Sequence, residues 1–154
     1  CPECYNPQYL MGDTQRWLEL ARRGRVKCLH EVTSTHLLLP ESASQSNNPS
    51  RLLRFILSSK HILDHYIEKY GCPPAIEAAA RARTSIGVLR CAFSAGDSSV
   101  AKQMREEYRQ SGGRRKITAF LYYFGSLSPM RRRIVQPALH GADLWDRALR
   151  KLTR

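Results

Sequence analysis

Glycine and proline residues divide the sequence after residue 50 into segments of a length that is typical of the helices in globular proteins. Glycine favours the end of a helix, whereas proline is tolerated in the first turn and disrupts the interior. Between these residues, apolar side chains recur at the three- and four-residue spacing of amphipathic helices. The pattern therefore predicts a set of short packed helices. The dividing residues are Gly71, Pro73, Pro74, Gly96, Gly112, Gly113, Pro129 and Pro137.

These signals also predict where each helix lies. The expected helices span residues 50–70, 75–95, 98–110 and 117–124, then a segment that opens at Ser128 and is interrupted by Pro137, and finally residues 142–152. The first of them has apolar residues on one side and polar residues on the other, so it must pack on another element. No internal repeat is evident.

The first 45 residues have a mixed pattern. Asp13 suits the N-cap of a short amphipathic helix, and Gly24 suits its end. Residues 26–29 and 32–39 are rich in β-branched and apolar side chains and predict two strands. We therefore expect an α+β fold that is mostly α. Residues 1–45 would form a helix–strand–strand element and residues 46–154 a basic bundle of short helices, with the Ser/Asn/Pro-rich stretch 42–50 as the junction.

Charge is distributed unevenly along the chain. The net charge is +12, with 25 basic and 13 acidic side chains. Residues 1–71 carry 9 basic and 7 acidic side chains, whereas residues 72–154 carry 16 and 6. The surplus therefore belongs to the second half, which could attract nucleic acid, anionic lipid or a phosphorylated acceptor.

We predict no metal site in this chain. Cys1 and Cys4 form a single C-x-x-C pair, which supplies only half of a tetrahedral zinc shell. His61 and His65 have the i, i+4 spacing of a helical metal pair, but no Glu follows His61 as in H-E-x-x-H. We interpret this histidine pair as part of a solvated helix face.

The stretch from Gly12 to Leu29 carries the most specific motif. An acid, Asp13, precedes "W-L-E-L-A-R-R-G", and an apolar stretch follows directly. This arrangement resembles the segment of family 2 glycosyltransferases that carries the catalytic base, and the likeness extends over about residues 7–45. The resemblance implies that residues 1–45 are the C-terminal end of a GT-A-type catalytic domain. It also implies an inverting transfer of a sugar from a nucleotide sugar to an acceptor hydroxyl, with Asp13 as general base.

The chemistry of Asp13 agrees with that role, although a simpler one is open. A carboxylate at a helix N-terminus stays ionised and can take a proton from a hydroxyl within hydrogen-bonding reach. The alternative is a helix cap alone, and the two roles are compatible. The resemblance adds four candidates for the acceptor site: Trp17, which also suits a core, and Glu41, Ser42 and Ser44.

Other parts of the family pattern are missing. Where many members carry "Y-R-x-H-x-x-S-x-S", this chain has His36, Leu37 and Leu39 in place of the Tyr, Arg and His. No D-x-D motif occurs, and the chain starts at Cys1 rather than Met. We therefore expect a fragment that is inactive alone. The full-length enzyme would use Mg or Mn, a nucleotide sugar, and a glycan or lipid-linked acceptor of a cell-envelope polysaccharide.

A second segment suggests a surface function. Two basic clusters flank an aromatic-rich stretch that contains Phe120 and Phe124. The arrangement suits a helix on an anionic membrane surface, although a core helix between two solvated basic turns is the simpler interpretation. Contact with the inner face of a membrane would fit a cytoplasmic protein. The candidate contact residues are Arg114, Arg115, Lys116, Arg131, Arg132 and Arg133.

Two further interpretations remain. The basic helices could grip nucleic acid through phosphate contacts, but no recognisable nucleic-acid-binding motif is present, so we do not favour this function. Alternatively, the helices after residue 50 could serve only in assembly with other proteins.

Overall fold

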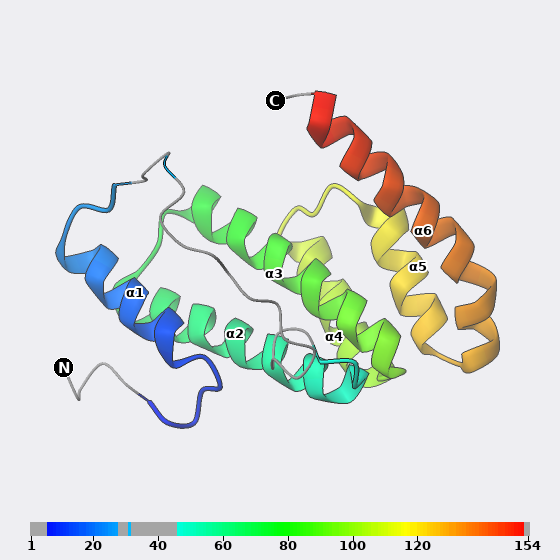
Figure 1. Ribbon diagram of the computed structural model, residues 1–154, viewed down its shortest axis with the longest axis horizontal. Coiled ribbons are helices and arrows are strands. Elements are labelled where there is room, and N and C mark those ends of the chain that lie inside the picture. The colour runs from blue at the N-terminus through cyan, green and yellow to red at the C-terminus, as the bar shows by residue number, and fades with distance from the viewer. Residues whose placement is uncertain (1–5, 28–30, 32–45, 153–154) are drawn as a thin grey trace. The chain divides into compact units, whose positions relative to one another are not determined.

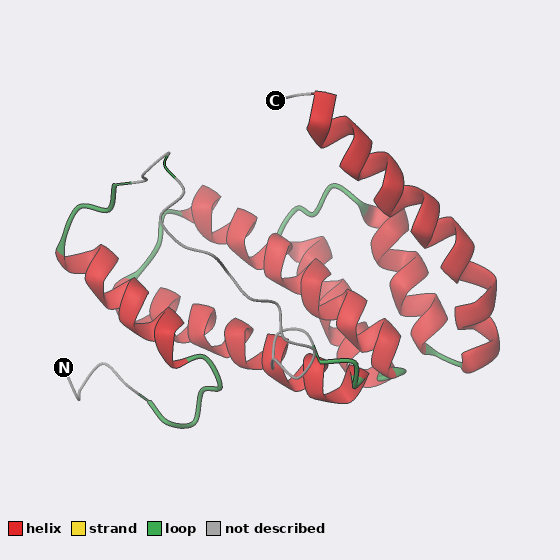
Figure 2. Cartoon of the chain, in the orientation of Figure 1, coloured by secondary structure: helices red, strands yellow, loops and turns green. Residues whose placement is uncertain are grey.

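A computed structural model of the chain describes residues 6–27, 31 and 46–152, and only the backbone beyond residue 141. Six helices make up its regular structure within those ranges (Figures 1 and 2). They form two units that meet in sequence between Gly71 and Cys72. The helices are α1 (Gly12–Arg23), α2 (Pro49–Tyr70), α3 (Pro74–Ala95), α4 (Ser98–Gln110), α5 (Lys116–Ser126) and α6 (Pro129–Leu152).

The predicted α+β fold class is wrong, because the described part of the chain is helical and contains no strand. Val26 and Lys27, which open the first predicted strand, are exposed and irregular. A β-branched sequence fits a strand only where a neighbouring strand pairs with it and a surface covers one face. The rest of that strand and all of the second lie outside the described residues. The predicted domain boundary after residue 45 falls there too and stays a prediction.

The helix predictions after residue 50 are confirmed to within one or two residues, with one exception. Pro137 does not divide the last segment, since α6 continues through it. The proline ring leaves the carbonyl of Arg133 without its helical N–H partner. Arg133 and Pro137 are both exposed, so water can donate to that carbonyl and the helix tolerates the proline.

The start of α1 also differs from the prediction. The helix begins at Gly12 after Met11, so Asp13 lies in the first turn and is not the N-cap. Its Oδ1 accepts a hydrogen bond from the adjacent N–H of Thr14 at 2.8 Å. The predicted end is confirmed, because Gly24 follows the last helical residue and its N–H donates to the carbonyl of Leu20 at 3.0 Å.

The second unit is built around a close contact between α3, α5 and α6. In this unit α5 packs against α3, α4 and α6, and α3 packs along α4. The rings of Phe93 and Tyr122 meet edge to face at 5.5 Å. A Cβ on Gly125 would lie 2.7 Å from Val135 Cγ2 and 2.8 Å from Phe93 Cδ2. Glycine is therefore required for α5 to approach its neighbours this closely.

We expect Gly125→Ala to destabilise the second unit by about 1–3 kcal/mol, because the added methyl group would overpack the contact. Gly141→Ala is the matched control, since a Cβ added at Gly141 in α6 would have nothing within 4 Å. The control should be neutral or stabilising by up to about 1 kcal/mol. Urea unfolding followed by circular dichroism measures both. Equal stability of the Gly125→Ala variant and the wild type would contradict the close packing.

Candidate functional sites

The α5 helix has a buried inner face of mainly small residues and an apolar outer face. Its buried residues are Ala119, Tyr122, Gly125 and Ser126. The opposite side carries what we call the α5 outer face: Ile117, Phe120, Phe124 and Leu127. Ile117 is 78% exposed and Phe120 is 45% exposed. Because the inner face has room for Tyr122 and otherwise only small residues, Ile117 and Phe120 are left at the surface.

Two arginines from neighbouring helices lie over the rings of α5. Arg105 of α4 places its Cζ 5.5 Å from the ring centroid of Phe120 and 5.2 Å from that of Tyr123. Arg131 of α6 lies 4.9 Å from the ring centroid of Phe124. Phe120 and Phe124 stack on each other at 5.9 Å. These cation–π contacts hold positive charge at the edges of an exposed aromatic surface.

The first half of α6 extends this apolar character beside α5 (Figure 1). Met130 is 75% exposed and Ile134 is 63% exposed, and one helical turn separates them. Arg131 lies on the adjacent side of the same turns and reaches Phe124. Isolated apolar residues at a surface are common, but a series of them rimmed by polar groups marks an interaction surface.

The predicted basic candidates do not all reach this surface. Arg132 packs over the ring of Phe93 at 5.7 Å and donates to the carbonyl of Ser94 at 3.0 Å, so it fastens α6 to α3. Arg131 and Arg133 are exposed. The sequence run of three arginines therefore contains two different roles, since successive helical positions point in directions about 100° apart.

The turn before α5 fixes the other basic cluster. The Oη of the buried Tyr108 accepts a hydrogen bond from the N–H of Arg115 at 2.9 Å. Gly113 lies directly against the Tyr108 ring, and its N–H donates to the carbonyl of Tyr108 at 2.9 Å. Arg114 and Lys116 are exposed on either side of this anchored residue. The cluster thus sits at a defined place, at the start of α5.

The described carboxylates of the second unit already have partners. Glu77 pairs with Arg81 at 2.8 Å, and Glu106 pairs with Arg109 at 2.6 Å. Asp97 caps α4 by accepting from the N–H of Val100, and Glu107 accepts from the buried Ser85. These contacts do not involve the exposed cations at the start of α5 and of α6, so the charge of those cations is available to an anionic partner. The cations in question are Arg114, Lys116 and Arg131.

Of the four acceptor-site candidates, the structure describes only Trp17, which lies one helical turn after Asp13 on α1. Asp13 is exposed in the first turn of α1. Trp17 is 69% exposed, so it is not a core residue of the described structure. Glu41, Ser42 and Ser44 lie outside the described residues, as do His36, Leu37 and Leu39. The catalytic role of Asp13 stays a prediction.

A buried carboxylate that is not among the predicted site residues joins α1 to α2. Glu19 accepts a hydrogen bond from Tyr70 Oη at 2.6 Å. Lys69 Nζ lies 3.6 Å from the same carboxyl group, and Arg22 Nε lies 3.7 Å from it. The hydrogen bond from Tyr70 is the main cause that lowers the pKa of Glu19 below its ordinary value of 4.5, and the two cations lower it further against the opposing effect of burial. In the sequence, the i, i+3 spacing of Glu19 and Arg22 indicated an ion pair at this place.

The stability of the α1–α2 contact should fall in acid. Because the pKa of Glu19 is lowered in the folded chain, its contribution is present above the ordinary carboxyl pKa and is lost as the pH falls through the lowered one. We therefore expect Glu19→Gln to weaken α1 protection at about pH 7 and to differ less from the wild type at about pH 3. Amide hydrogen exchange of α1 measures this.

Glu68→Gln provides the control, because Glu68 is an exposed carboxylate of α2 that is not among the contacts of Glu19. Its exchange rates should match those of the wild type at both pH values. A Glu19→Gln effect that is as large in acid as at neutral pH would contradict the electrostatic account.

None of the described helices combines the length and apolarity needed to cross a bilayer. Within the same residues, no cluster of three His, Cys, Asp or Glu side chains could hold a metal ion. Comparisons with family models, with curated proteins and with solved structures found no match to this chain.

Proposed function

We propose that the second unit binds the surface of an anionic membrane, with the α5 outer face at the level of the lipid headgroups. The observation that carries this proposal is the exposed apolar face of α5 with Arg105 and Arg131 held over its rings. Apolar side chains bury part of their surface at the headgroup boundary, and basic side chains nearby are attracted by anionic lipid. A cytoplasmic leaflet, which carries the anionic lipids, fits this charge.

The packing of the aromatic rings and the aliphatic surface beside them favour a membrane surface over a nucleic acid as the partner. Nucleic-acid binding depends on cations that contact phosphates, with aromatic rings free to stack on bases. Here the rings of Phe120 and Phe124 stack on each other and are already covered by arginines. Ile117, Met130 and Ile134 add aliphatic surface, which has no use against phosphates but is stabilised at a lipid interface.

Vesicle co-sedimentation tests the proposal. We expect binding to phosphatidylcholine vesicles that contain phosphatidylglycerol, weak binding to phosphatidylcholine alone, and weaker binding at about 1 M than at about 0.1 M salt. Phe120→Ser should lower the partition coefficient roughly 5- to 30-fold, corresponding to about 1–2 kcal/mol of lost apolar transfer. Arg131→Gln should lower it roughly 5-fold, and only where anionic lipid is present.

The first unit supplies matched controls. Val26→Ser and Arg25→Gln remove an exposed apolar side chain and an exposed cation outside α5 and α6. Both should bind vesicles as the wild type does. Binding that is insensitive to anionic lipid and salt, or that is lost equally in the controls, would contradict the proposal. Salt-sensitive binding to DNA or RNA that depends on Arg131 but not on Phe120 would favour a nucleic-acid function.

We retain as a second proposal that α1 contributes the base Asp13 to a glycosyltransferase. What supports it is the resemblance around Asp13 together with the exposure of that carboxylate and of Trp17. A base must be free to approach the acceptor hydroxyl. In the protein expressed from its own gene, we expect Asp13→Asn to lower sugar transfer roughly 10²- to 10⁴-fold. The control is Glu31→Gln, and full activity of Asp13→Asn would contradict the role.

A further inference from the structure

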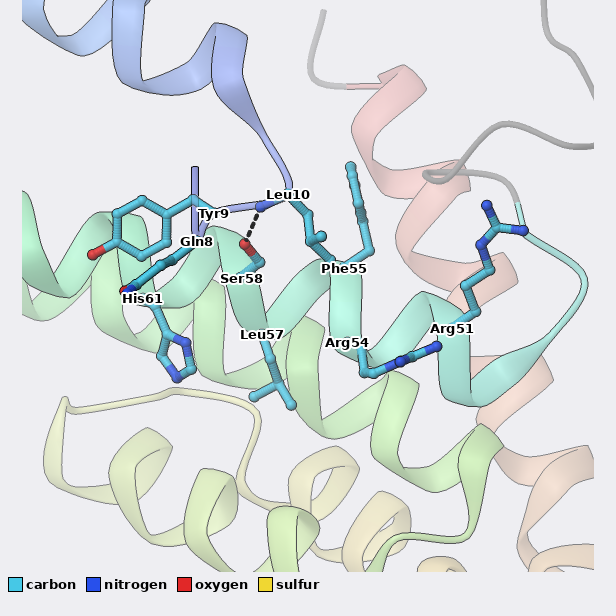
Figure 3. A pocket seen from close by; sticks show the side chains of 9 residues that line it. All are labelled: Gln8, Tyr9, Leu10, Arg51, Arg54, Phe55, Leu57, Ser58 and His61. Carbon is cyan, nitrogen blue, oxygen red and sulfur yellow. Dashed lines mark hydrogen bonds between the residues drawn. The ribbon is translucent and has the colours of Figure 1, made fainter. Parts of the chain in front are cut away.

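A cavity of about 710 Å³ lies along α2 in the first unit. Figure 3 shows α2 as its floor, with Tyr9, Leu10 and Phe55 along one side and Leu57 and His61 along the other. Arg51 and Arg54 lie toward one end. Two arginines and a histidine thus line the cavity, whereas none of its nine lining residues is a carboxylate.

The arginines of this cavity keep their charge available. Neither Arg51 nor Arg54 forms an ion pair with another described residue. The closest carboxylate along α2 is that of Asp64, which pairs with Lys60 at 2.6 Å. A guanidinium group forms strong, directed hydrogen bonds with an oxyanion, so two of them beside one cavity favour an anionic ligand.

A buried hydroxyl adds a third donor. Ser58 is 7% exposed, and its Oγ accepts a hydrogen bond from the N–H of Leu10 at 2.8 Å (Figure 3). Its own proton has no acceptor among the described residues. A buried hydroxyl that accepts one hydrogen bond and donates none can donate a hydrogen bond to a ligand oxygen at little cost.

Hydrogen bonds fix the segment that carries Tyr9, on the aromatic side of the cavity, before any ligand binds. The buried Gln15 accepts from the N–H of Asn6 at 2.8 Å and donates to the carbonyl of Asn6 at 3.2 Å. These bonds and that of Leu10 to Ser58 fix both ends of the segment that carries Tyr9. The Tyr9 ring also lies 6.3 Å from that of His65. A ligand would therefore meet a preformed wall and lose less entropy on binding.

We propose that this cavity binds a phosphate monoester, with the phosphate at Arg51 and Arg54 and an apolar or aromatic group against Tyr9 and Phe55. A phosphate monoester has close to two negative charges at neutral pH and three acceptor oxygens, which match two guanidinium groups and one hydroxyl. The ester can be a soluble molecule or the headgroup of a lipid such as phosphatidic acid. The site lies in the first unit and does not depend on the membrane proposal for the second.

Calorimetry with phenyl phosphate, and vesicle binding with phosphatidic acid, test the two sources. We expect saturable binding in at least one arm, no binding of uncharged benzyl alcohol, and a loss of roughly 10- to 100-fold in Arg54→Gln and in Arg51→Gln. Both side chains are exposed, so these variants should fold as the wild type does. Arg25→Gln serves as the matched control and should bind normally.

Binding in the soluble arm identifies a small phosphate ester, and binding only to phosphatidic acid identifies a lipid headgroup. To keep the vesicle arm specific for this cavity, it is measured in the Phe120→Ser background. No saturable binding in either arm would overturn the proposal. So would binding that Arg25→Gln weakens as much as Arg54→Gln does.

Discussion

The close approach of α5 to its neighbours at Gly125 determines what the second unit presents to its surroundings. Phe93 and Val135 occupy the space where a side chain of residue 125 would lie. Protein interiors are packed to near-crystalline density, so a helix that approaches this closely can bury only small groups and a few well-fitted rings on that side. The remaining large side chains of α5 are consequently placed outward, which creates the apolar outer face.

Packing also gives the arginines of the second unit different roles. Arg132 is used to fasten α6 to α3 through Phe93 and Ser94, whereas Arg105 and Arg131 cover the aromatic rings from outside. A long cationic side chain can cover an apolar surface with its methylene groups while its head stays in water. Under the membrane proposal, Arg105 and Arg131 would exchange these ring contacts for contacts with anionic lipid.

Most of the helical structure was predictable, because its signals are local. Gly71, Gly96 and Pro74 mark helix ends through backbone geometry alone, and these boundaries are confirmed. The α+β fold class was wrong for the described residues, where Val26 and Lys27 are irregular, because β-branched composition indicates only that a segment suits a sheet, and a sheet also needs a partner strand. The predicted helix break at Pro137 was wrong for a related reason. The effect of the proline depends on whether water reaches the freed carbonyl, which is determined by the tertiary position of the residue.

The sites were predictable only in part. The basic and aromatic segment around α5 was visible in the sequence, but its sequence could not separate Arg131 from Arg132. The burial of Gln15, Glu19 and Ser58 was not predicted, because a polar residue on a helix is expected to face solvent. Their burial follows from how α1, α2 and the preceding segment pack. No local pattern encodes that packing.

The most direct test of the account is whether the α5 outer face enters the lipid interface. The Phe120→Trp variant, in a chain whose Trp17 and Trp145 are replaced by Phe, reports its depth through quenching by brominated lipids. If α5 enters the interface, we expect a blue-shifted emission that is quenched by bromines near the headgroups, at a depth of about 5–10 Å. An unshifted and unquenched emission from vesicle-bound protein would contradict it.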